Sequence, residues 1–135
     1  MSILVDTSAF LAILNKEDPN NASATELLAS FVEDGEELFC TNYILVVSYA
    51  LIQRRLGMDA IRDFQKEILP SIKIVWLGLE EHKHIVARLI SDNRRNLSFV
   101  DWSSFETLER LGIKSVFTFD RHFREQGFDV IPEVF

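Results

Sequence analysis

The sequence is poor in the residues that cross-link or interrupt a fold. Its 135 residues include 1 Cys, 3 Pro and 5 Gly. The single cysteine, Cys40, cannot pair within the chain, which excludes a disulfide scaffold and favours the reducing cytoplasm. The scarcity of proline and glycine excludes a collagen-like repeat and indicates short loops. We therefore expect one cytoplasmic domain, spanning residues 1–135, that is held together by a hydrophobic core.

Long apolar runs and a basic leader are also absent. No stretch reaches the roughly 18 apolar residues that a membrane span needs. The N-terminal residues contain no base and reach an acid at Asp6, so we expect neither a secretory signal nor a membrane anchor. Hydrophobic residues nevertheless make up 47% of the chain and charged residues 26%, which excludes intrinsic disorder.

Positive charge is scarce in the chain as a whole but not in its second half. The chain has 21 acids against 14 bases and a net charge of −7, which argues against a uniformly basic nucleic-acid binder. Residues 82–124, however, carry 8 bases and 5 acids. This local excess permits contact with a polyanion on one face, although a solvated helix surface is the other explanation.

Short apolar runs alternate with segments of helical periodicity. We expect strands at residues 3–5, 38–40, 72–76, 115–119 and 128–131. We expect helices near residues 10–14, 20–33, 42–56, 59–69, 80–93, 98–111 and 121–126. This order is typical of α/β proteins, and it predicts a three-layer α/β/α sandwich around a mostly parallel sheet of four to five strands.

Three aspartates lie where such a sheet would place a ligand site. Asp6 and Asp120 each follow a predicted strand, and Asp101 lies in the first turn of a predicted helix. Ligands of parallel sheets bind beyond the carboxyl ends of the strands, so we expect the three side chains to converge. Clustered carboxylates repel one another unless a cation lies among them, and their oxygens suit Mg²⁺ or Mn²⁺. Such an ion can activate water for hydrolysis of a phosphodiester.

Each aspartate also has a purely structural explanation. Asp6 and Asp120 could cap the helices that follow them, and Ser98 with Asp101 fits a capping box. No Gly-rich phosphate loop, paired-cysteine zinc motif or nucleophile elbow competes with the acidic cluster. A phosphoacceptor domain of response-regulator type would need an early acidic pair and a late lysine, and Asp6 stands alone with no lysine after Phe117.

Four other side chains have less certain roles. His82 and His84 are two residues apart and therefore point to different sides of a helix, which favours surface positions over metal binding. His122 lies beside an aspartate and could touch a substrate, or could be an exposed residue of a first helical turn. Trp102 could stack on a base or belong to the core.

Four stretches, in order, carry a family resemblance: Ile3–Ser8, Thr41–Gly57, Leu97–Asp101 and Leu111–Phe123. Together they resemble the PIN domain, especially the toxin subunit of VapBC toxin–antitoxin modules, over nearly the whole chain. The resemblance implies a single PIN-like domain and a Mg²⁺- or Mn²⁺-dependent endoribonuclease that hydrolyses RNA.

The resemblance also implies site residues. Acids that hold the metal and act in catalysis would be Asp6, Asp101 and Asp120. Small hydroxyl residues that support them would be Ser8, Ser104 and Thr118. By charge and by closeness to the acidic segments, we expect the RNA phosphates to be bound by Arg94, Arg95, Arg121 and Arg124.

The resemblance further implies a homodimer and a VapB-like antitoxin that lays a helix or strand across the toxin. An apolar groove near Phe10, Leu14, Leu27 and Phe31 would suit that antitoxin, unless these residues are ordinary core.

One departure from the family pattern concerns the central helix. The family carries a glutamate there, and the corresponding residue is Val47; no acid occurs between Glu37 and Asp59. An isopropyl group cannot ligate a cation, so divalent binding and rate are expected to fall. Three explanations stay open: a slower nuclease that works with three acids, an impaired module that still binds RNA or an antitoxin, and a substitution introduced to disarm a toxin.

Overall fold

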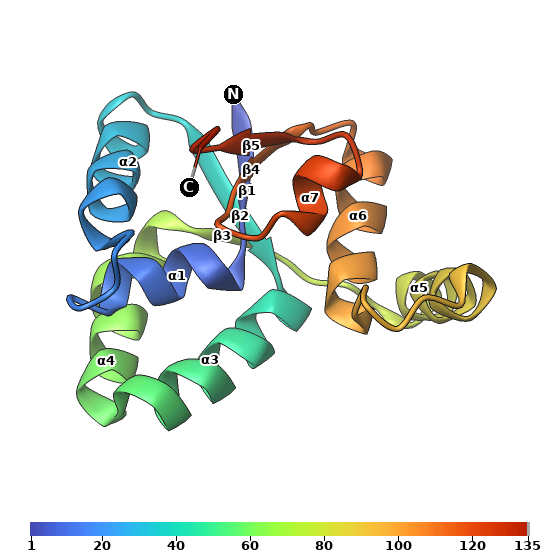
Figure 1. Cartoon of the computed structure of the whole chain (residues 1–135), viewed down its shortest axis with the longest axis horizontal. Helices are drawn as coiled ribbons and strands as arrows, with labels where there is room; N and C mark the ends of the chain where they lie inside the picture. Colours follow the sequence, from blue (N-terminus) through green and yellow to red (C-terminus); the bar gives the residue numbers. More distant parts are fainter. Residues whose placement is uncertain (135) are drawn as a thin grey trace.

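The computed structural model describes residues 1–134 and has an α/β fold around a five-stranded sheet. The strand order is β3-β2-β1-β4-β5, and each neighbouring pair is parallel. The strands are β1 (Ser2–Val5), β2 (Glu37–Thr41), β3 (Lys73–Val75), β4 (Ser115–Phe117) and β5 (Asp129–Ile131). Figure 1 shows helices on two sides of this sheet, which confirms the predicted fold class.

The helices follow the predicted segments closely. They are α1 (Thr7–Leu14), α2 (Asn21–Glu33), α3 (Asn42–Leu56), α4 (Met58–Asp63), α5 (Leu79–Asp92), α6 (Phe99–Leu111) and α7 (His122–Glu125). After α4 the chain makes a π-helical turn at Phe64–Ile68 and a short 3₁₀ turn at Leu69–Ser71, where Pro70 cannot continue a regular helix. Within the described residues, none of the helices combines the length and apolar character that crossing a bilayer requires.

The central strand explains why the acids are placed at one edge. Ile3, Leu4 and Val5 of β1 are all 0% exposed, as expected for a strand that is covered on both faces. β1 pairs with β2 on one side and with β4 on the other, all in the same direction. The chain therefore leaves β1 and β4 at the same edge, and the Asp6 N–H donates to the Phe117 carbonyl at 3.0 Å across that edge.

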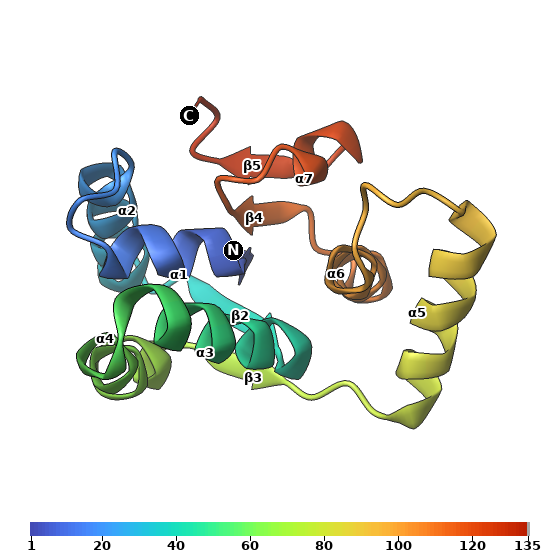
Figure 2. The same ribbon diagram turned by 60° about the horizontal axis from the view of Figure 1, so that its bottom comes forward.

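Local signals fix the two helices that border the site. Thr41 caps α3, because its Oγ1 accepts a hydrogen bond from the Ile44 N–H at 3.1 Å. α6 begins with a complete capping box between Ser98 and Asp101, and Gly112 ends it at a φ of 68°. α5 packs on α6 and lies apart from the sheet (Figure 2).

The core includes two residues that could have lined an antitoxin groove. Phe10 is 0% exposed and packs edge-on against Phe64, and Phe31 is 7% exposed and packs edge-on against Phe117. A docking groove at Phe10 and Phe31 is therefore wrong, and the core explanation is right for both. Leu14 and Leu27 are only partly buried against the same core.

Trp102 is also a core residue. It is 5% exposed and packs edge-on against Phe105, and the Arg88 guanidinium lies 4.7 Å from the centre of its ring. The low exposure confirms the core explanation for Trp102 rather than stacking on a nucleobase.

Candidate metal centre

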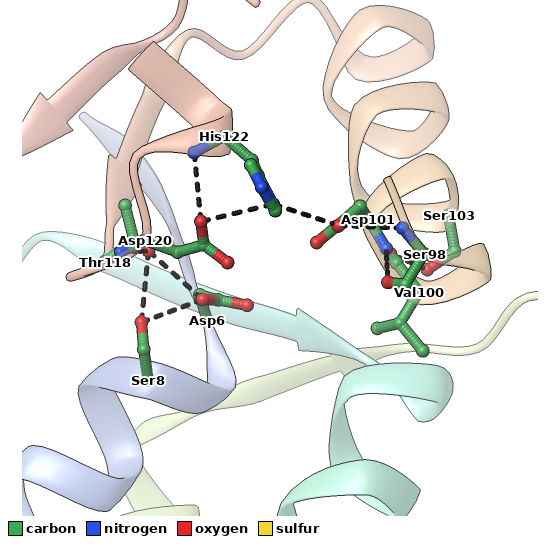
Figure 3. Close-up of polar contacts among 9 residues, drawn as sticks. All are labelled: Asp6, Ser8, Ser98, Val100, Asp101, Ser103, Thr118, Asp120 and His122. Atoms are coloured by element: carbon green, nitrogen blue, oxygen red, sulfur yellow. Dashed lines mark hydrogen bonds and ion pairs between the residues drawn. The ribbon is translucent and has the colours of Figure 1, made fainter. Parts of the chain in front are cut away.

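The three predicted aspartates come together at the carboxyl edge of the sheet (Figure 3). Asp6 lies between β1 and α1, Asp120 in the loop between β4 and α7, and Asp101 in the first turn of α6. His122 lies between the latter two: its Nδ1 is 3.2 Å from Asp101 Oδ2 and 3.3 Å from Asp120 Oδ1. Two carboxylates from distant parts of the chain therefore meet at one imidazole.

The Asp6 carboxylate is held by two hydroxyl groups in a buried part of the site. Its Oδ2 accepts hydrogen bonds from the hydroxyls of Ser8 at 2.8 Å and Thr118 at 3.1 Å. The pKa of Asp6 is raised to about 6, mainly by burial and also by the charges of Asp120 and Asp101, while the two hydroxyls lower it in part. Negative charge at this position is thus unfavourable until a cation compensates it.

The two hydroxyls also tie Asp6 to the loop that carries Asp120. Ser8 Oγ lies 3.1 Å from Thr118 Oγ1 and accepts a hydrogen bond from the Phe119 N–H at 2.9 Å. Thr118 Oγ1 accepts another from the Asp120 N–H at 2.9 Å. The same groups that position the Asp6 carboxylate therefore set the path of the backbone towards Asp120.

The capping explanation applies to these acids unequally. The Asp6 carboxylate accepts no hydrogen bond from a backbone N–H of α1, so capping does not explain it. Asp101 Oδ2 accepts from the Ser98 N–H at 2.9 Å, and Asp120 Oδ1 accepts from the His122 N–H at 2.9 Å. Each of these two carboxylates is therefore anchored through one oxygen. Across residues 1–134 the other oxygen of each makes no hydrogen bond.

The remaining predicted residues are placed at different distances from this cluster. Ser104 follows Asp101 by one turn on the same face of α6, and its buried hydroxyl has no hydrogen-bond partner within residues 1–134. Arg121 is exposed and lines an open depression of about 560 Å³ together with Asp120 and His122.

The other predicted arginines lie outside that depression. Arg94 forms an ion pair with Asp92 at 2.7 Å, and Arg95 is exposed beside it. Arg124 donates to the backbone carbonyl of Glu133, on the side of β5. Among the four predicted phosphate binders, only Arg121 lines the depression that contains Asp120.

Val47 lies on α3, the helix next to Asp6, and adds no ligand to the site. Thr7, which follows Asp6, and Ser48, which follows Val47, have their hydroxyls 2.9 Å apart, so α3 packs directly beside the Asp6 backbone. Val47 lines an apolar pocket of about 390 Å³ with Tyr43 and with residues 99 and 100 of α6. The side chain at the position expected for the family glutamate thus lines an apolar pocket.

The donor atoms suit a divalent cation. One atom each from Asp101, Asp120 and His122 lies within 4.8 Å of the others, and Asp6 adjoins them through its charge interactions with both aspartates. The buried His122 Nδ1 makes no hydrogen bond within residues 1–134, although two carboxylate oxygens lie beside it. Carboxylate oxygens with open positions fit Mg²⁺ or Mn²⁺. The sequence left the role of His122 open between a substrate contact and an exposed residue. Its spacing of two residues from Asp120 was the one feature that pointed to the acidic cluster.

Comparison with known proteins gives relatives over almost the whole chain. The chain is 28% identical over 133 residues to "23S rRNA-specific endonuclease VapC20" of Mycobacterium tuberculosis (strain CDC 1551 / Oshkosh), a match that covers 97% of this chain and 99% of that protein. The crystal structure of VapC20, described as a Sarcin-Ricin loop cleaving toxin, superposes with a TM-score of 0.80 at 26% identity, covering 93% of this chain and 95% of that one.

A more distant solved structure shares the fold. VapBC2 from Rickettsia felis, bound to a DNA fragment from its promoter, matches with a TM-score of 0.67 at 11% identity and covers 96% of this chain and 97% of that one. The family model described as PIN domain matches residues 3–129. PIN domains are nucleases that generally depend on divalent metal ions, in agreement with the acidic cluster. The chain belongs to the PIN domain family.

Proposed function

We propose that this protein is a VapC-type toxin, an endoribonuclease that hydrolyses RNA phosphodiesters with Mg²⁺ or Mn²⁺. The observation that carries this proposal is the meeting of three carboxylates, Asp6, Asp101 and Asp120, at the open carboxyl edge of the sheet. Its relative VapC20 is named as an endonuclease specific for 23S rRNA. We therefore extend RNA cleavage, and ribosomal RNA as the first substrate to test, to this chain.

The surroundings of each side chain indicate its role in the proposed centre. Asp101 and Asp120, each anchored through one oxygen, would hold the ion, and Asp6 would complete the centre as its charge is compensated. A bound ion of this type lowers the pKa of a water ligand and polarises a phosphoryl oxygen. Ser8 and Thr118 keep the Asp6 carboxylate in place, and Ser104 has a hydroxyl free to bond a water at the centre.

RNA would approach from the depression beside the acids. Arg121 is the first candidate for a phosphate contact, because it lines that depression next to Asp120. Arg94 and Arg95 follow α5, and Arg124 lies in α7, so these three would bind phosphates farther along the strand. A basic rim around an acidic centre would bring a polyanion to a site that otherwise repels it.

Two protein partners belong to the same proposal. Val46, Trp76 and Leu79 are 67%, 72% and 67% exposed, and the first two line the apolar pocket at Val47. Exposed apolar patches of this kind mark protein interfaces, and we assign this one to a homodimer. A VapB-like antitoxin in the cytoplasm would be the second partner, as the fold shared with VapBC2 supports.

A catalytically impaired module is the competing candidate. Val47 favours it, because α3 offers no carboxylate and an anionic ligand is therefore missing. Such a module would bind RNA or an antitoxin without cleaving RNA.

Cleavage assays separate the two candidates. The protein is incubated with ribosomal RNA and with a sarcin–ricin stem-loop in Mg²⁺, in Mn²⁺ and in chelator, beside the variants Asp6→Asn and Asp59→Asn. Asp59 is fully exposed on α4 and serves as the matched control. We expect metal-dependent cleavage that Asp6→Asn abolishes and Asp59→Asn preserves. Absence of cleavage with either metal, together with retained RNA binding, would establish the impaired module instead.

A further inference from the structure

We propose that His122 ligates the metal ion through Nδ1, in place of the carboxylate that α3 lacks, and that this nitrogen makes the centre select Mn²⁺ over Mg²⁺. The inference rests on the proposed metal-dependent function, but it concerns a different property: the identity of one ligand and the choice of ion. It is carried by the position of the imidazole between two carboxylates.

The distances fit neighbouring ligands of one ion. In an octahedral site with metal–ligand bonds of about 2.1 Å, adjacent donor atoms lie about 3.0 Å apart. His122 Nδ1 lies 3.2 Å from Asp101 Oδ2 and 3.3 Å from Asp120 Oδ1. Little movement would therefore separate the present arrangement from one in which all three atoms share an ion.

The state of the nitrogen agrees with this role. His122 Nδ1 is buried, yet it makes no hydrogen bond within the described chain. A buried polar atom without a partner lowers the stability of the fold. Its neighbours are carboxylate oxygens that need a cation. The side chain as a whole is 31% exposed, so the imidazole lies at the boundary between the cluster and solvent.

The backbone of His122 is held firmly enough to present a ligand. Its N–H donates to Asp120 Oδ1 at 2.9 Å. The next residue, Phe123, is 0% exposed and packs edge-on against Phe105 of α6, the helix that carries Asp101. α7 and α6 are thus packed together just beside the cluster, which fixes the imidazole relative to both aspartates.

The ligand set determines the preferred ion. Three carboxylates and one imidazole offer four donors, as many as a set with a fourth acid, but with one negative charge fewer. Mg²⁺ takes oxygen ligands almost exclusively, whereas an imidazole nitrogen is acceptable to Mn²⁺ and to later transition metals. Replacing a carboxylate by a histidine therefore lowers affinity for Mg²⁺ more than affinity for Mn²⁺.

The test measures metal binding directly. Mn²⁺ and Mg²⁺ are titrated calorimetrically into the intact protein, into His122→Asn and into His84→Asn, and the Mn²⁺ forms are examined by pulsed electron paramagnetic resonance for ¹⁴N coupling. His84 is exposed on α5 and is the matched control. We expect the intact protein to bind Mn²⁺ at least tenfold more tightly than Mg²⁺ and to show coupling from one directly bound nitrogen. His122→Asn should lose that coupling and about tenfold or more in Mn²⁺ affinity, and His84→Asn should keep both.

The spectroscopic result on the intact protein does not depend on whether a variant folds. Absence of ¹⁴N coupling in the Mn²⁺ form, or absence of any Mn²⁺ binding, overturns the ligand assignment. Cleavage of RNA with Mn²⁺ but without that coupling would leave the proposed function standing and remove His122 from the centre. Coupling without cleavage would keep His122 as a ligand and contradict the proposed function.

Discussion

The candidate centre has two unlike sides. On the side of β4, α6 and α7, carboxylates, hydroxyls and an imidazole are linked by hydrogen bonds and ion pairs from Asp6 to Asp101. On the side of α3, Val47 and Tyr43 line a pocket that is almost entirely apolar. The helices and strands around the centre are therefore present on both sides, but only the side of β4, α6 and α7 carries metal ligands. The predictions below change one side or the other.

The largest effect is expected from the polar side. Asp120→Asn removes a negative charge from the centre but keeps an oxygen that can accept the His122 N–H hydrogen bond. RNA cleavage in Mn²⁺ should fall by about 100-fold or more. A single-turnover assay with excess enzyme measures the rate. Cleavage within a few-fold of the unchanged protein would mean that Asp120 is only a helix-capping residue.

Asp6 is expected to weaken the metal-free fold. Its pKa is raised from 3.8 to about 6, so the folded state disfavours the ionised carboxylate. The free energy of unfolding should therefore fall as pH rises from about 4 to about 6 and stay low above that range. In chelator at pH 7, Asp6→Asn should be more stable than the unchanged protein, by at most about 3 kcal/mol.

Urea unfolding at several pH values tests this second prediction. The stabilisation by Asp6→Asn should disappear near pH 4, where the native carboxyl is protonated. Equal stability of the two proteins across the whole range would contradict the account of Asp6.

A change on the α3 side sharpens the comparison. Val47→Glu places a carboxylate beside the Asp6 backbone, to which α3 is joined through Thr7 and Ser48. RNA cleavage in Mg²⁺ should rise by about tenfold or more, because an oxygen ligand favours that ion. Ala50→Glu, an exposed position on the same helix, controls for added charge. An equal response of both variants would show that Val47 does not face the centre.

The smallest effect is expected from a hydroxyl. Thr118→Val keeps the shape of a fully buried side chain but removes the acceptor of the Asp120 N–H and a donor to Asp6. The free energy of unfolding should decrease by about 1–2 kcal/mol. Thermal unfolding in chelator measures it. A variant as stable as the unchanged protein would mean that the loop path does not depend on this hydroxyl.

Local signals in the sequence predict much of this structure. The apolar run at Ile3–Val5 is the central buried strand, and the predicted capping box of Ser98 and Asp101 is present. Asp6 and Asp120 meet because parallel strands end at one edge, which follows from topology alone.

What could not be predicted depends on packing between distant segments. The imidazole of His122 lies beside Asp101 because α7 packs on α6 through Phe123 and Phe105, and no local pattern specifies that contact. Similarly, the apolar faces that carry Phe10 and Phe31 were recognisable, but whether the rest of the chain covered them was not.

Anomalous diffraction from crystals soaked in Mn²⁺ tests the metal centre most directly. We predict a single strong peak at bonding distance from Asp101, Asp120 and His122, with Asp6 bound directly or through a water. A saturated soak that leaves this edge of the sheet without a peak would contradict the account.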